Sequence, residues 1–105
     1  MFAQIEMPDA NEEFNKTQLV IYIRQAINGQ RLTKSAAAAR MGVEEPKVSA
    51  LMNGCLESFS SEQLMRLLTA LGRDIEIRVK DIPRSRTRGL IRVRSSWPAH
   101  PRHAR

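Results

Sequence analysis

The amino-acid sequence predicts an all-α bundle of four to five short helices, followed by a β-strand that pairs across a dimer. Three observations indicate this fold. Apolar residues recur at spacings of three and four between residues 15 and 71, and a glycine-centred turn divides two of these segments. At residues 73–80 the pattern then changes to strict alternation. We expect a domain over residues 15–80, between a flexible N-terminal arm (1–14) and a basic, mostly flexible tail (81–105).

The 105 residues of the chain suffice for one domain, and 42% of them are hydrophobic. No apolar run approaches the roughly 18 residues that span a bilayer. Cys55 is the only cysteine, which suits a reducing cytoplasm.

The net positive charge of the chain is concentrated at its C-terminal end. Residues 1–80 carry equal numbers of acids and bases, whereas residues 81–105 hold seven arginines and one aspartate and so account for the whole net charge of +6. Such an end either attracts nucleic acid or is a solvated tail.

The N-terminal arm is acidic and lacks periodicity. It holds four acids and no base before residue 15, so we expect no cleaved export signal, which begins with basic residues. Its apolar side chains could dock on a partner, and a frayed terminus is an equal alternative. These apolar residues are Met1, Phe2, Ile5, Met7 and Phe14.

The first helix is expected to begin at Asn15, because Asn15 and Gln18 resemble an N-cap signature. It should end near Asn28 and Gly29. Its apolar face consists of Leu19, Val20, Ile23, Ala26 and Ile27.

The next two helices are expected to form a helix-turn-helix. Thr33 is a suitable N-cap for the first of them, and Gly42 can take the positive φ that ends it. Glu44 and Pro46 then open the following helix, which Asn53 and Gly54 terminate. The apolar positions are Ala37, Ala38 and Met41 in one helix and Val48, Leu51 and Met52 in the other.

A fourth helix follows, with a capping box made by Ser60 and Gln63. Gly72 closes it. Its apolar face is Leu64, Leu67, Leu68 and Leu71.

Residues 73–80 are predicted to be a strand that needs a partner, because a single strand leaves its backbone groups unpaired. Residues 90–93 of the same chain are one candidate, and residues 73–80 of a second copy are the other. Antiparallel self-pairing centred on Ile77 would place Asp74 opposite Lys80 and Glu76 opposite Arg78 of the other copy, so every charged pair would have opposite signs. This favours a homodimer, with Ile75, Ile77 and Val79 as the dimerising residues.

The segment from Leu32 to Lys80 resembles the lambda-repressor-like (Cro, XRE) helix-turn-helix domains. More narrowly, it is similar to the antitoxin branch that pairs with RelE/HigB-like toxins. The resemblance covers about half of the chain. It rests on Leu32-Thr33, Ala38, Gly42-Val43, the run from Pro46 to Leu51, Asn53-Gly54, Phe59-Ser60 and the run from Leu64 to Ile77.

The resemblance implies a cytoplasmic, dimeric repressor that binds operator DNA through the major groove and also neutralises a toxin encoded beside it. Glu45, Lys47 and Ser49 are then the candidates for base contacts. Lys34 and Asn53 are the candidates for phosphate contacts. The alternatives are a stand-alone, phage-like XRE regulator and a toxin-neutralising interaction module with little DNA binding.

No catalytic or metal site is expected. His100 and His103 lie in the tail without a nearby cysteine or carboxylate, and no phosphate-binding glycine loop occurs. We therefore expect a non-enzymatic protein without a cofactor and without a membrane partner.

Overall fold

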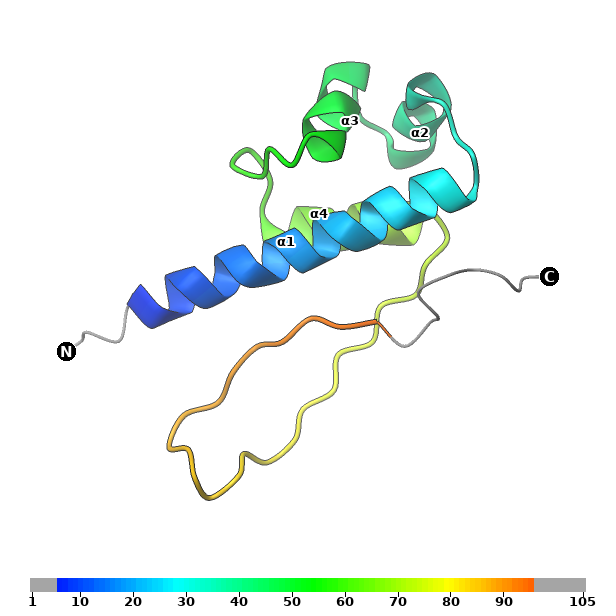
Figure 1. Cartoon of the computed structure of the whole chain (residues 1–105). Coiled ribbons are helices and arrows are strands. Elements are labelled where there is room, and N and C mark those ends of the chain that lie inside the picture. Colours follow the sequence, from blue (N-terminus) through cyan, green and yellow to red (C-terminus); the bar gives the residue numbers. More distant parts are fainter. Residues whose placement is uncertain (1–5, 96–105) are drawn as a thin grey trace.

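The computed structural model describes residues 6–95 and folds them as four helices in two layers (Figure 1). In one layer the long helix α1 (Glu6–Gly29) packs beside α4 (Ser61–Ala70), the most extensive helix contact of the described chain. The other layer holds α2 (Lys34–Met41) and α3 (Glu45–Met52). Within the described residues the prediction of an all-α bundle is confirmed.

The core lies between these layers and is built from the predicted apolar faces. Ile23, Leu51 and Leu64 are completely buried. Burial of a side chain of this size contributes about 1.5–3 kcal/mol, so these faces hold the two layers together. The other buried apolar residues of the helices are Leu19, Val20, Ala26, Ile27, Ala37, Ala38, Met41, Val48, Leu67 and Leu68.

The helix ends follow the local signals of the sequence. Thr33 Oγ1 accepts a hydrogen bond from the Ala36 N–H at 3.0 Å, so it caps α2. At the start of α4, Ser60 Oγ accepts from the Gln63 N–H and Gln63 Oε1 accepts from the Ser60 N–H, which completes the predicted capping box. Glu44 precedes α3 without a side-chain capping bond.

The start of α1 differs from the prediction. The helix begins at Glu6, nine residues before Asn15, so residues 6–14 extend the helix where we expected an arm. Pro8 is compatible with this start, because a residue in the first turn needs no intrahelical partner for its missing N–H. Residues 1–5 lie outside the described part of the chain.

Asn15 is an internal residue of α1 with a long-range role. Its side chain is 4% exposed and binds the backbone of a segment far along the chain. Asn15 Nδ2 donates to the Ile91 carbonyl at 2.7 Å, and Asn15 Oδ1 accepts from the Val93 N–H at 3.1 Å. We call this pair of hydrogen bonds the Asn15 clasp.

The predicted strand at residues 73–80 is absent from the described chain. These residues belong to an extended excursion, the C-terminal loop (residues 73–95), and no strand is formed within residues 6–95. Residues 74–82 make no backbone hydrogen bond to any described residue. One reason is that the Asn15 clasp holds residues 91–93 against α1, so the intrachain partner that we considered is engaged elsewhere. Pairing of residues 73–80 with a second copy stays a prediction.

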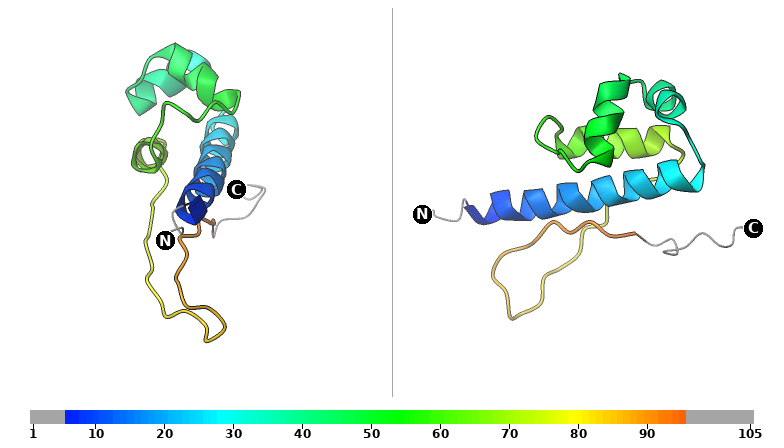
Figure 2. Two further views of the ribbon diagram at one scale, coloured as in Figure 1. Left: turned by 90° about the vertical axis from the view of Figure 1, so that its left-hand side faces the viewer. Right: turned by 45° about the horizontal axis from the view of Figure 1, so that its top comes forward.

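The C-terminal loop projects from the α1–α4 layer on the side away from α2 and α3. The views in Figures 1 and 2 agree on this arrangement. Ile75 and Val93, at the two ends of the loop, pack partly against the core. Residues 81–95 of the predicted basic tail are therefore part of this loop, and residues 96–105, with His100 and His103, lie outside the described part.

Candidate nucleic-acid interface

The helix-turn-helix is set by a tight glycine turn between α2 and α3. Gly42 has a φ of 73°, and its N–H donates to the Ala38 carbonyl at 2.8 Å. The Val43 N–H donates to the same carbonyl at 3.0 Å. Both bonds occupy a carbonyl that the helix end would leave unpaired, and the left-handed turn redirects the chain into α3.

The orientation of α3 follows from its two buried residues. Val48 and Leu51 are 1% and 0% exposed, so they fix which side of the helix faces the core. At about 100° per residue, the opposite side is a strip centred on positions 46, 49, 50 and 53. We call this the outward strip, and it consists of Pro46, Ser49, Ala50 and Asn53.

The three predicted base-contact residues do not share one face of α3. Ser49 lies on the outward strip and is half-buried. Glu45 and Lys47 are both exposed but are about 160° apart around the helix axis, so they flank the strip on opposite edges. Pro46 and Ala50 also lie on the outward strip but were not among the predicted base-contact residues. A helical wheel with Val48 and Leu51 on the buried side would have placed both of them on the outward side.

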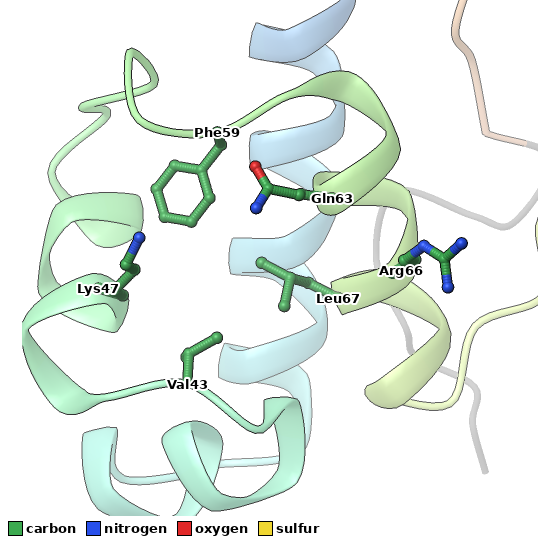
Figure 3. A pocket seen from close by; sticks show the side chains of 6 residues that line it. All are labelled: Val43, Lys47, Phe59, Gln63, Arg66 and Leu67. Atoms are coloured by element: carbon green, nitrogen blue, oxygen red, sulfur yellow. The ribbon is translucent and has the colours of Figure 1, made fainter.

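Lys47 lies at the edge of α3 that faces α4. Its Nζ atom is 5.2 Å from the centre of the Phe59 ring, and Phe59 is buried just before α4. Figure 3 shows the Lys47 side chain directed toward this ring. Because a cation within about 6 Å of a ring centre is attracted to its π face, Phe59 holds the ammonium group at this edge.

An open hollow lies between Lys47 and α4 (Figure 3). Its volume is about 190 Å³, smaller than the roughly 300–1,000 Å³ of small-molecule pockets. Arg66 at its rim pairs with Glu62 at 2.9 Å. The hollow is thus unsuited to a drug-sized ligand. Its lining residues are Val43, Lys47, Phe59, Gln63, Arg66 and Leu67.

The two predicted phosphate contacts lie at the ends of the motif. Lys34 is the first residue of α2, and Asn53 follows the last residue of α3; both are exposed. The Asn53 N–H donates to the Ser49 carbonyl at 3.0 Å. Both side chains are thus free to reach solvent at the two ends of the motif, and their phosphate contacts stay a prediction.

The predicted dimerising residues differ in exposure. Ile75 is half-buried against the core, whereas Ile77 and Val79 are 78% and 91% exposed. Leu90 and Ile91, on the returning half of the C-terminal loop (residues 82–95), are also exposed. These apolar side chains lie on the loop, away from α3.

Other kinds of site find little support in the described residues. Among the side chains of residues 12–95, no group of three or more histidine, cysteine, aspartate or glutamate residues could hold a metal ion. Cys55 is an exposed thiol. None of the helices in this part of the chain is long and apolar enough to cross a membrane.

Comparison with known proteins identifies the family. The model of the helix-turn-helix domain family matches residues 1–80. A solved structure named "Putative XRE Family Transcriptional Regulator" is 47% identical, with a TM-score of 0.80, and the match covers 85% of this chain and 100% of that one. No curated protein matches. The chain therefore belongs to the helix-turn-helix domain family, in its XRE branch of transcriptional regulators.

Proposed function

We propose that this protein is a sequence-specific DNA-binding transcriptional regulator, a repressor that inserts α3 into the major groove of an operator. The observation that carries the proposal is the direction of α3, which the buried Val48 and Leu51 and the Gly42 turn fix. This direction leaves Glu45, Pro46 and Lys47 exposed in the first turn of the helix. An α-helix presented in this way fits the width of the major groove. The XRE branch supports the same role.

The residues of α3 suggest a division of contacts. Lys47 can donate to guanine O6 and N7, and Glu45 can accept from cytosine N4. Ser49 can serve either role, and the methyl group of Ala50 suits the methyl group of thymine. Lys34 and Asn53 would bind phosphates and set the register of the helix in the groove.

We further propose that the protein acts as a homodimer on two half-sites about one helical turn apart. In this dimer, residues 73–80 of two copies would pair. What supports it is that Ile77 and Val79 are highly exposed and that the backbone of residues 74–82 forms no backbone hydrogen bond within the described chain. Such a regulator would work in the cytoplasm.

A narrower hypothesis is that the protein is the antitoxin of a type II toxin–antitoxin pair and represses its own operon. The resemblance of residues 32–80 to antitoxins of RelE/HigB-like toxins supports it. Exposed apolar side chains on the C-terminal loop could contact a toxin on the side away from the DNA. A stand-alone XRE regulator, or a toxin-neutralising module with little DNA binding, is the alternative.

Two experiments test these proposals. In an electrophoretic mobility shift with the DNA upstream of its own reading frame, the protein should prefer that DNA over an unrelated duplex. Equal binding of both at low salt would contradict the repressor. Co-expression with the neighbouring small reading frame should give a complex and restore growth; neither a complex nor rescue would contradict the antitoxin role.

A further inference from the structure

The returning half of the C-terminal loop carries a dense positive charge. Four of its arginines are exposed and Arg86 is half-buried. Among residues 12–95, whose side chains the structure describes, the ion pair joins Arg66 to Glu62 on α4, and none of these arginines is ion-paired with a carboxylate of that range. The acids of the loop, Asp74, Glu76 and Asp81, all lie on its outgoing half. Residues 82–95 contain no acid and five arginines, namely Arg84, Arg86, Arg88, Arg92 and Arg94.

This charge lies on the side of the molecule away from the outward strip of α3. Figures 1 and 2 show α2 and α3 on one side of the α1–α4 layer and the C-terminal loop on the other. The Asn15 clasp fixes the returning half of the loop to α1 in this position. A straight duplex bound by α3 would therefore not reach these arginines.

Two details of the loop indicate what it can bind. Arg86 Nη1 is buried without a hydrogen-bond acceptor in the described chain, so the guanidinium would gain a bond by moving out to an oxygen. Guanidinium groups match phosphate oxygens in charge and geometry. Residues 82–95 contain no aromatic side chain, whereas single-stranded nucleic acids are held largely by stacking on aromatic rings. The loop thus fits the backbone of a duplex better than unpaired bases.

We propose that the C-terminal loop is a second DNA-binding surface, which holds the phosphate backbone of a duplex segment other than the one that α3 reads. One protein would then bridge two DNA segments. The first segment is chosen by sequence, which rests on the proposed function, and the second is bound through charge alone.

The experiment compares three forms of the full chain. The test variant is Arg84→Gln with Arg86→Gln and Arg88→Gln, and the matched control replaces the same residues by lysine, which keeps the charge. Binding of an unrelated duplex is titrated by fluorescence anisotropy over a range of salt. In parallel, upstream DNA is fixed on beads, and a fluorescent unrelated duplex is captured through the protein.

We expect the natural protein and the lysine control to capture the fluorescent duplex, and the glutamine variant to lose capture while it still binds the upstream DNA. In the titration, the slope of log K against log salt should be shallower for the glutamine variant than for the natural protein by about 2.7 per protomer. Each of the three lost phosphate contacts contributes about 0.9 to this slope. An unchanged slope in the glutamine variant would overturn the inference.

The remaining outcomes separate this inference from the proposed function. If the natural protein binds upstream DNA and captures no second duplex, the bridging surface is excluded and the repressor stands. If the glutamine variant loses affinity for the upstream DNA as well, the loop contacts the same duplex as α3, which also overturns the inference. If the protein does not prefer the upstream DNA over the unrelated duplex, the proposed repressor function is wrong. The difference in salt slope between the natural protein and the glutamine variant then decides whether the loop binds DNA.

Discussion

The Nζ atom of Lys47 lies 5.2 Å from the centre of the Phe59 ring and connects the first turn of α3 with the start of α4. At an exposed position this attraction is worth about 0.5–1 kcal/mol. Because this attraction is weak, exchanging it for a hydrogen bond from Lys47 to a DNA base would cost little free energy. Phe59 thus keeps the lysine at one edge of the outward strip without preventing its use in the groove.

The capping box at the start of α4 makes a measurable contribution to stability. Replacing Ser60 by alanine removes the acceptor for the Gln63 N–H and should lower the free energy of unfolding by about 1 kcal/mol. Ser58→Ala, at an exposed position before the helix, is the control and should change it little. Equal urea midpoints for both variants would contradict the assignment of the cap.

The turn between α2 and α3 requires glycine. Gly42→Ala should destabilise the domain by about 1–2 kcal/mol, because a Cβ is disfavoured at a φ of 73°. Gly29, the last residue of α1, is a matched control with open space around it and no positive φ. Gly29→Ala should be neutral or slightly stabilising. Thermal unfolding of both variants measures the difference, and equal destabilisation would argue against backbone strain at the turn.

The Asn15 clasp should control the attachment of the C-terminal loop. In Asn15→Ala, the Val93 amide loses its acceptor, so its hydrogen exchange should accelerate while amides in α4 remain protected. The free energy of unfolding should fall by about 1–3 kcal/mol, since a part-buried hydrogen-bond pair is broken. Thr17→Ala on the same helix, whose exposed hydroxyl donates to the Glu13 carbonyl, is the control. Unchanged Val93 exchange would show that the clasp does not hold the loop.

The proposed dimer can be tested by exchanging two charges. In antiparallel pairing centred on Ile77, Glu76 faces Arg78 of the other copy, so Glu76→Arg or Arg78→Glu alone should weaken the dimer. The double exchange should restore it, because every pair again has opposite signs. Each pair is worth roughly 0.2–1 kcal/mol and occurs twice, which sedimentation equilibrium can resolve. A double variant as weak as the single ones would contradict this register.

Features decided by neighbouring residues could be predicted from the sequence. The cap at Thr33, the capping box at Ser60 and the turn at Gly42 each depend on contacts within about one helical turn. Asn15 could not be assigned in this way. It has the local pattern of an N-cap, but its partners Ile91 and Val93 are 76 and 78 residues away.

In the candidate site, too, some features follow from neighbouring residues and others depend on residues far along the chain. The position of the helix-turn-helix follows from local spacing, whereas the separation of Glu45 from Lys47 depends on which side of α3 packs on the core. The contact between Lys47 and Phe59 depends on where α4 lies. The path of the C-terminal loop was missed because alternation predicts an extended backbone but not its hydrogen-bonding partner.

The central claim, that α3 reads an operator, is tested most directly by the affinity of Lys47→Ala for the upstream DNA and for single-base variants of that site. We expect a loss of about 1–3 kcal/mol and relaxed preference at one base pair of each half-site. Arg24→Ala, which removes an equal charge from an exposed position on α1, should leave both unchanged. A Lys47→Ala protein with unaltered affinity and unaltered base preference would contradict the claim.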